Sequence, residues 1–363
     1  MQAPFHPSYA GARAAFLDAA AAAQARISSD EHPLRGRDGE VLAVDVAVLG
    51  DPAARKRLLV SSGCHGVEGY CGSGVQIAAL QDAALHAACR RTGVTLVLAH
   101  ALNPYGFSHL RRVTHENVDL NRNFQDFGRP LPVNEAYAEL HALLLPADWP
   151  PDAVNQRAIG EVLATRGVKF LQAAVSGGQY AFGDGLFYGG NAPTWSNLAF
   201  RRLLREHLAG ATQMGWIDLH TGLGPTGHGE RIFVSGGGDH DRASRWWGSD
   251  GRTPLTSAED GSSTSAVLTG TIAGACRDEC PRTQVTSIFL EFGTRPPLEM
   301  LQALRAEQWL TLHAEASAET HRSIKQQFLD ALFVDTPQWR ASILEQGREA
   351  IGQAVAGLGS KET

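Results

Sequence analysis

The sequence lacks the features of a membrane-spanning, secreted or nucleic-acid-binding protein. It has 363 residues and no apolar run of roughly 18 or more, the length needed to cross a bilayer. Its first residues lack the charged and then apolar layout of a signal peptide. It has no block of Lys and Arg to neutralise phosphates, and the formal net charge is −6. We therefore expect neither a membrane nor a nucleic acid as a partner.

Disulfide bonds are not expected either. The five cysteines, Cys64, Cys71, Cys89, Cys276 and Cys280, form no C-x-x-C pair and leave one over. This pattern is typical of reduced thiols and predicts a cytoplasmic location. Cys64 is interpreted as a small buried residue at a strand end rather than a metal ligand. With 43% hydrophobic and 19% charged residues, the chain can bury a large core without covalent cross-links.

Apolar periodicity predicts strands that alternate with helices. The expected strands cover residues 40–49, 57–62, 94–99, 215–220, 231–235 and 284–292. The expected helices cover residues 9–27, 73–91, 134–145, 153–174, 196–210 and 297 to about 357. This alternation predicts an α/β fold with a mixed, largely parallel central sheet flanked by helices on both faces. We expect one catalytic domain over residues 1–363, with a helical insertion at about 130–190 and a helical C-terminal region from about 297.

The stretch SSGCHGVEGY, residues 61–70, joins an apolar strand to a helical pattern through a glycine-rich turn. His65 and Glu68 are three residues apart, so they point the same way in a single helical turn. Together they offer nitrogen and oxygen donors, which suit zinc if a third protein ligand is present. His220 and Glu291 each lie at the end of another apolar strand. Ligands of open α/β sheets bind beyond the carboxyl ends of the strands, where these residues can meet.

Several polar residues near these ligands have the chemistry that a hydrolytic site needs. A metal-bound imidazole normally donates its second N–H to a carboxylate, for which Asp119 is the first candidate and Asp218 the second. Glu291 stands between apolar neighbours that raise a carboxyl pKa, whereas a nearby cation lowers it. Such a group can take a proton from water and deliver it to a leaving group. Arg112 offers an oxyanion donor.

A substrate carboxylate also has candidate partners. Arg122 offers a planar fork for bidentate capture of a carboxylate, and Asn121 beside it offers an amide donor. Taken singly, Arg112, Asp119 and Arg122 could instead form a structural ion-pair network under a loop. The run GGGDHD at residues 236–241 indicates an active-site loop, since it lacks the Lys-Ser/Thr of a phosphate cradle.

Four segments, taken in order, resemble motifs of the zinc carboxypeptidases of the carboxypeptidase A type. That superfamily includes bacterial amidases acting on small peptides and, more distantly, aspartoacylase-like deacylases. The segments are HGVE at 65–68, NPYG at 103–106 followed by Arg112 and VDLNRNF at 118–124, DLHT at 218–221, and LEF at 290–292. They span roughly residues 57–293. The block from 103 to 124 is the most specific of the four.

The resemblance implies a zinc-dependent hydrolase that cleaves an amide or peptide bond next to a free carboxylate. It implies that one Zn2+ is bound by His65, Glu68 and His220, and that Asp119 orients His65. It further implies that Arg112 stabilises the oxyanion, that Asn121 and Arg122 hold the substrate's carboxylate, and that Glu291 is general base and acid. Arg112 is preferred over Arg111 because it stands seven residues before Asp119.

Two departures limit the resemblance and leave alternatives open. Tyr105 stands where the second motif has Asp. Residues 270–280 contain no tyrosine, although the family places a mobile tyrosine over the substrate there. The resemblance therefore does not extend to trimming of long peptides, and we expect a small peptide or an N-acyl amino acid as substrate. The alternatives are an aspartoacylase-like deacylase and a catalytically silent protein that binds a carboxylated ligand or a partner.

Overall fold

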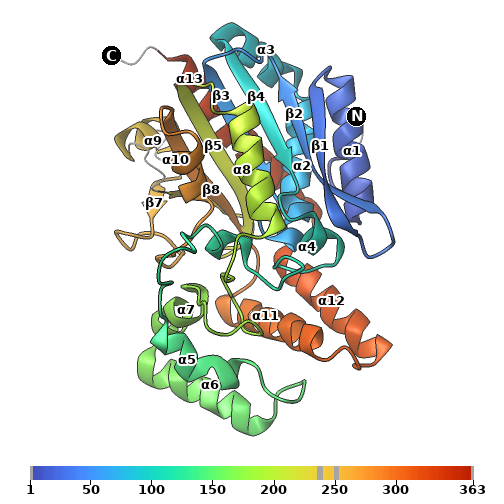
Figure 1. Cartoon of the computed structure of the whole chain (residues 1–363), viewed down its shortest axis with the longest axis vertical. Helices are drawn as coiled ribbons and strands as arrows, with labels where there is room; N and C mark the ends of the chain where they lie inside the picture. The colour runs from blue at the N-terminus through green and yellow to red at the C-terminus, as the bar shows by residue number, and fades with distance from the viewer. Residues whose placement is uncertain (1–2, 235–239, 249–252, 361–363) are drawn as a thin grey trace.

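The computed structural model describes residues 3–234, 240–248 and 253–360. In this part of the chain, one eight-stranded sheet has the order β1-β2-β4-β3-β5-β8-β6-β7 (Figure 1). The pairs β4/β3, β3/β5, β5/β8 and β6/β7 are parallel, and β1/β2, β2/β4 and β6/β8 are antiparallel. The prediction of a mixed, largely parallel sheet is therefore confirmed. The strands are β1 Arg26–Arg35, β2 Val41–Leu49, β3 Lys56–Ser62, β4 Val94–His100, β5 Gln213–Gly222, β6 Gly229–Phe233, β7 Leu255–Ser257 and β8 Gln284–Gly293.

Helices cover both faces of the sheet, because successive side chains of a strand point to opposite faces. Leu58 and Val60 of β3 pack in one hydrophobic cluster, whereas Leu59 between them packs in a second cluster on the other face. The first cluster includes residues of α1 (Tyr9–Ala22), α2 (Gly69–Gln81), α3 (Ala83–Thr92), α9 (His240–Trp247) and α13 (Pro337–Gly359), and it continues into helices at one end of the sheet. The second cluster includes residues of α8 (Trp195–His207) and α10 (Ala273–Glu279).

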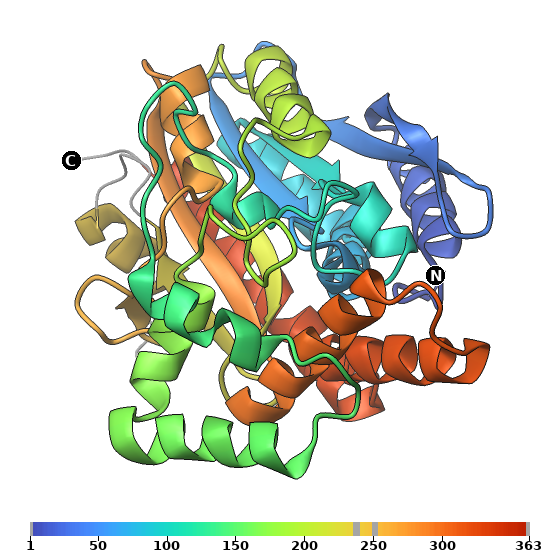
Figure 2. The same cartoon turned by 60° about the horizontal axis from the view of Figure 1, so that its bottom comes forward.

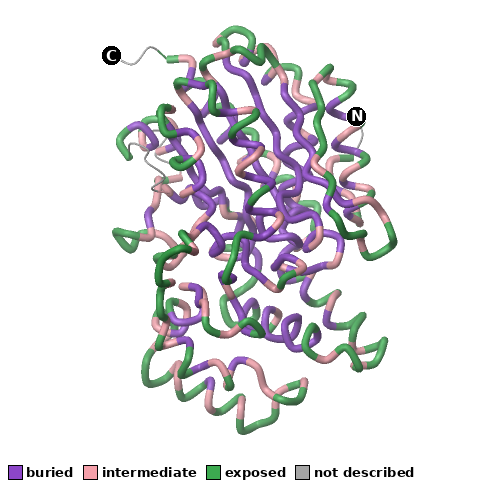
Figure 3. The backbone as a smooth tube through the Cα atoms, in the orientation of Figure 1, coloured by how far each residue is buried: buried purple, intermediate pink, exposed green. Residues whose placement is uncertain are grey.

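A third group of helices lies beyond one end of the sheet, where α4 (Pro104–Ser108) is also found (Figures 1 and 2). The group consists of α5 (Glu135–Leu144), α6 (Ala153–Arg166), α7 (Val168–Ser176), α11 (Pro297–Leu312) and α12 (Ala318–Leu332). The helix α6 is the outermost member of this group (Figure 3). Ile159 is the one buried residue of α6. No helix among the described residues is long and apolar enough to cross a bilayer.

Three predicted helices are interrupted in the structure. The helix expected over 73–91 is divided at Asp82, whose side chain accepts from two backbone N–H groups of α3 and so caps a new helix. The helix expected over 153–174 is divided at Gly167, which has a φ of +83°. The helical region from 297 to about 357 is three helices, α11, α12 and α13.

The N-terminal prediction also needs correction. The helix expected over 9–27 ends at Ala22, and the strand β1 follows it without having been predicted. This edge strand has a single buried residue, His32, so it carries no apolar alternation to reveal it. The interpretation of GGGDHD as a loop falls mainly on residues 236–239, which lie outside the described residues. His240 and Asp241 are the first residues of α9.

Candidate metal centre

The centre lies at the carboxyl ends of three neighbouring parallel strands, β3, β5 and β8. His65 is the third residue after β3, while His220 and Glu291 lie near the ends of β5 and β8. His220 is the direct register partner of Glu291. Parallel strands that end at the same edge bring residues far apart in sequence to one place, as the sequence led us to expect.

A single turn of 3-10 helix, η1 (Gly66–Glu68), positions the first two candidate ligands: His65 precedes it as the N-cap residue, and Glu68 is its last residue. The backbone N–H groups of Gly66 and Val67 donate to the carbonyls of Arg112 and Arg111 at 3.0 and 2.9 Å. A Cβ at Gly66 would lie 2.1 Å from the backbone of Gly106, so this close approach requires glycine. The HGVE turn is thus packed directly on the NPYG segment and on the chain that carries the two arginines.

Glu68 lies between the two histidines. Its Oε1 is 2.9 Å from Nδ1 of His65, and its Oε2 is 3.2 Å from Nδ1 of His220. The backbone N–H of Thr221 also donates to Oε2, at 3.1 Å. One ligand atom from each of the three residues lies within 4.8 Å of the others. The structure therefore brings together the two imidazoles and the carboxylate that the sequence predicts as metal ligands.

The far nitrogen of each imidazole lies against a buried aspartate. Nε2 of His220 donates to Oδ2 of Asp218 at 2.7 Å, and Nε2 of His65 is 3.2 Å from Oδ1 of Asp119. Both rings therefore turn Nδ1 toward Glu68. Ser61 donates its hydroxyl to the second oxygen of Asp218 at 2.6 Å, which holds that carboxylate in place. Histidines that bind metals are oriented in this way.

Arg112, not Arg111, enters the centre. Its Nε donates to Oδ2 of Asp119 at 3.0 Å, and its Nη1 donates to Oε1 of Glu68 at 3.1 Å. Its Nη2 lies 2.8 Å from Nε2 of His65. Arg111 turns away and donates to Glu307 at 3.1 Å.

The buried charges at this centre do not balance. The carboxylates of Glu68, Asp119 and Asp218 face two buried guanidinium groups, those of Arg112 and Arg122, which leaves a net charge of −1 if both imidazoles are neutral. All three carboxylate side chains are at most 2% exposed. Uncompensated buried charge is costly, so this donor set fits a divalent cation both in its atoms and in its charge.

The pKa shifts express the same imbalance. Burial alone would lower the pKa of His220, but the carboxylates of Asp218 and Glu68 raise it well above its usual value. Burial would raise the pKa of Asp119, but Arg112 and His65 hold it well below its usual value. The pKa of Glu68 is likewise lowered against burial, by the two histidines. Without a cation, a proton on His220 offsets part of the negative charge.

Glu291 faces the same space, but its pKa is raised, whereas the pKa values of Glu68 and Asp119 are lowered. Burial and then the charge of Glu68 raise its pKa to about 7, against the smaller opposing effect of His220. Its Oε1 accepts a hydrogen bond from the backbone N–H of Leu223 at 3.0 Å. A carboxyl group that titrates near neutral pH, beside a candidate metal site, has the pKa of a general acid and base.

Asn121 and Arg122 lie on the short turn η2 (Leu120–Arg122), which Asp119 caps. Oδ1 of Asn121 accepts from the backbone N–H of Ile272 at 3.0 Å. Arg122 donates to the carbonyl oxygen of Asn121 at 2.8 Å and, through Nε, to that of Ser176 at 3.1 Å. Both residues line the cleft over the candidate metal centre, and Arg122 also holds the end of α7 through the carbonyl of Ser176.

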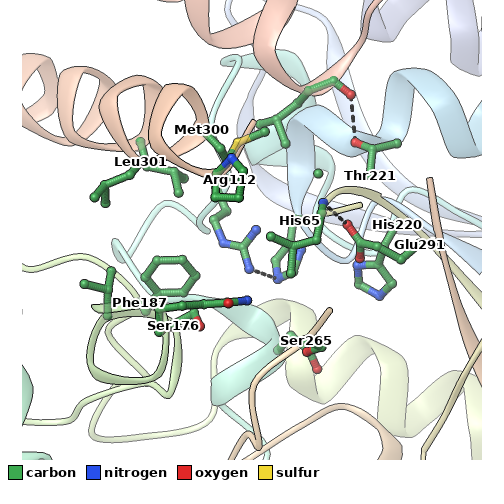
Figure 4. Close-up of a pocket in the computed structure, with 18 of the residues that line it drawn as sticks. His65, Arg112, Ser176, Phe187, His220, Thr221, Ser265, Glu291, Met300 and Leu301 are labelled. Atoms are coloured by element: carbon green, nitrogen blue, oxygen red, sulfur yellow. Dashed lines mark hydrogen bonds between the residues drawn. The ribbon is translucent and has the colours of Figure 1, made fainter. Parts of the chain in front are cut away.

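The cleft over the centre has an empty volume of about 1030 Å³. All of the predicted site residues line it except the two aspartates, Asp119 and Asp218. In Figure 4, Phe187 and Leu301 lie to one side of Arg112, and His220 and Glu291 lie to the other. Phe187 and the apolar wall from α7 and α11 were missed from the sequence, because helical periodicity does not say which cavity a helix lines.

Cys64, Asp218 and His220 form a second group with ligand atoms close together. Burial raises the pKa of the Cys64 thiol well above its usual value, which disfavours the thiolate that would bind a metal. Nε2 of His220 is also already bonded to Asp218. The geometry therefore favours the site at His65, Glu68 and His220.

Curated protein sequences give no match to this chain. Among solved structures, carboxypeptidase A from Helicoverpa armigera is 11% identical with a TM-score of 0.47, over 91% of this chain and 75% of that one. Bovine thrombin-activatable fibrinolysis inhibitor, in complex with tick carboxypeptidase inhibitor, is 8% identical with a TM-score of 0.47, over 98% and 97%. A metallo-carboxypeptidase from Burkholderia cenocepacia is 13% identical with a TM-score of 0.41, over 88% and 66%. Residues 5–346 match one family model, and the chain therefore belongs to the family described as protein of unknown function DUF2817.

Proposed function

We propose that this protein is a zinc-dependent hydrolase that cleaves an amide or peptide bond next to a free carboxylate. The observation that carries the proposal is the buried group of two imidazoles and the Glu68 carboxylate, whose ligand atoms lie within 4.8 Å of one another and whose imidazoles are each backed by an aspartate. His65, Glu68 and His220 would hold one ion, and two histidines with one carboxylate are a zinc donor set with a position left for substrate. When bound, the ion supplies a Lewis acid that polarises the amide carbonyl and activates water.

Glu291 is the proposed general base and acid. Its carboxylate accepts a proton from the attacking water, and its carboxyl group then delivers that proton to the nitrogen of the leaving amine. The overall change is addition of one water molecule across the amide bond. The positive charge of a bound cation lowers the pKa of Glu291 from about 7, so the base form is present at neutral pH.

Arg112 and the η2 turn are proposed to position the substrate. The guanidinium of Arg112, now hydrogen-bonded to Asp119 and Glu68, would turn one N–H to the carbonyl oxygen as negative charge develops there. Arg122 donates to neutral backbone carbonyls, so these bonds leave its positive charge available to a substrate carboxylate. Burial lowers the pKa of Arg122, and an anion beside it would offset that cost.

A deacylase acting on N-acyl amino acids is the second candidate. In the family that the motifs resemble, residues 270–280 would carry a mobile tyrosine. Here the carbonyl of Gly270 accepts from Phe124 N at 2.9 Å, and Ile272 N donates to Asn121, so this segment is fastened to the η2 turn. A fixed segment without tyrosine suits a small substrate better than the end of a long peptide.

The test combines metal analysis with kinetics. We expect one equivalent of zinc in the purified protein, and zinc-restored hydrolysis after chelation. Glu291→Gln should retain zinc and lose hydrolysis, whereas the control Glu299→Gln, at an exposed position of α11, should retain both. A panel of dipeptides and N-acyl amino acids separates peptidase from deacylase. Zinc and ligand binding without any hydrolysis would instead identify a catalytically silent protein.

A further inference from the structure

One part of the cleft beside the metal centre has aliphatic walls contributed by two helices. The helix α7 provides Val168, Leu171 and Val175, and α11 provides Leu298 and Leu301. These helices belong to different parts of the chain and meet beyond the carboxyl ends of the strands (Figures 1 and 2). The metal ligands and the aliphatic side chains line one continuous cleft.

The apolar lining continues to the protein surface on both helices. Val168 is 50% exposed and Leu298 is 45% exposed, whereas Leu171 is 3% and Leu301 8% exposed. On each helix, the exposed and the buried residue are three positions apart and therefore share a face. Each helix thus presents an aliphatic stripe that leads from solvent toward the metal centre. Exposed apolar residues on both sides of one cleft are typical of a ligand groove.

Together, the aliphatic residues of α7 and α11 form what we call the aliphatic stripe of the cleft. Phe187 lies between this stripe and the polar residues of the candidate metal centre (Figure 4). Its ring centroid lies 4.8 Å from the guanidinium carbon of Arg112 and 5.5 Å from that of Arg122. Its backbone has a φ of +52°, a region that side-chain-bearing residues seldom adopt, and Gln179 N donates to its carbonyl at 3.2 Å.

We propose that the stripe between α7 and α11 seats an aliphatic chain attached next to the scissile amide, an inference that rests on the proposed hydrolase function. Val168 to Val175 spans about 10 Å at a helical rise of 1.5 Å per residue, which matches an extended chain of about eight carbons. The chain belongs either to the acyl group or to the side chain of the residue that bears the carboxylate. The two sources share the same chemistry and are separated by the test.

The test uses two substrate series with the zinc-loaded protein. One series varies the acyl chain of N-acylglycines from two to twelve carbons, and the other varies the side chain of N-acetyl 2-aminoalkanoic acids. In the series whose variable chain occupies the stripe, kcat/KM should rise about fourfold per added methylene group and level off near eight carbons. The other series should show no such dependence. The Kd of the same compounds for Glu291→Gln should fall in parallel, which gives a readout that does not need turnover.

Variants locate the effect. Val168→Asp and Leu298→Asp should each lower kcat/KM for the longest chain about tenfold or more with zinc content unchanged. Val154→Asp is the matched control, because Val154 is 64% exposed on α6 and does not line the cleft. Flat dependence on chain length in both series, or equal behaviour of the three variants, would overturn the aliphatic site. Tighter binding of longer chains without any hydrolysis would retain the site and refute the hydrolase.

Discussion

Asp218 holds His220 by its far nitrogen, with Nε2 and Oδ2 2.7 Å apart. The two residues are two positions apart on β5 and therefore point to the same side of the sheet. Asp119 lies 3.2 Å from the far nitrogen of His65, although neither residue is on a strand: Asp119 caps η2, and His65 lies in the turn after β3. Two unrelated pieces of local structure thus turn both imidazoles the same way, with Nδ1 facing Glu68.

Asp218→Asn should weaken zinc binding by about 10- to 100-fold, because an amide neither fixes the tautomer nor raises the basicity of His220 as a carboxylate does. Competition with a chromophoric chelator measures the affinity. Asp148→Asn, at an exposed position, is the control and should bind zinc as the unmodified protein does. Equal zinc affinity in the two variants would mean that Asp218 does not orient a ligand.

Arg112→Ala should lower kcat by about 10²- to 10³-fold, because a donor to the developing oxyanion acts mainly in the transition state. Zinc should remain bound, since the three ligands are intact and the negative charge around them increases. Arg129→Ala is the control, because the Arg129 side chain is 81% exposed. Steady-state kinetics that show an effect on KM alone would assign Arg112 to substrate binding instead.

The segment that carries the two arginines is fastened by a buried ion network. Oε1 of Glu307 on α11 accepts from Arg111 at 3.1 Å and from Lys325 on α12 at 2.6 Å. Glu307→Ala leaves both cations without that partner, and we expect a loss of about 3–5 kcal/mol in the free energy of unfolding. Urea denaturation measures this loss. Glu299→Ala, on the exposed face of α11, should change stability by less than about 0.5 kcal/mol.

The centre of the sheet could be predicted from sequence because its strands are buried on both faces and appear as apolar runs. β4 is buried at every position, and β3 is buried at all but its first. β1 could not be predicted in this way, since its pairing with β2 is a backbone interaction that leaves no apolar pattern. The helix boundaries at Asp82 and Gly167 each depend on a single residue. Both residues stand inside longer stretches of helical apolar periodicity, so the pattern predicted one continuous helix in each place.

In the candidate site too, some residues could be predicted from the sequence and others could not. His65, Glu68, His220 and Glu291 could be predicted to lie together, because parallel strands place their carboxyl ends at one edge. The carboxylate partner of His220 was only a second candidate, since spacing alone does not show which nitrogen a carboxylate meets. The aliphatic stripe was not predicted, because α7 and α11 are brought together by tertiary packing of segments more than a hundred residues apart.

Glu291 should make the metal-free protein less stable as the pH rises. Its folded pKa, about 7, lies above the ordinary value of 4.5, so the folded state binds more protons than the unfolded state between these values. Stability from the protonated group is therefore present below pH 4.5 and is lost as the pH rises through about 7. The loss at pH 8 is at most about 3 kcal/mol.

Glu291→Gln stays neutral, so with chelator present it should melt above the unmodified protein at pH 8 and close to it at pH 5. Thermal melts at both pH values measure this, and a Glu291→Gln protein that gains nothing at pH 8 would show that the carboxylate is well solvated and not raised in pKa.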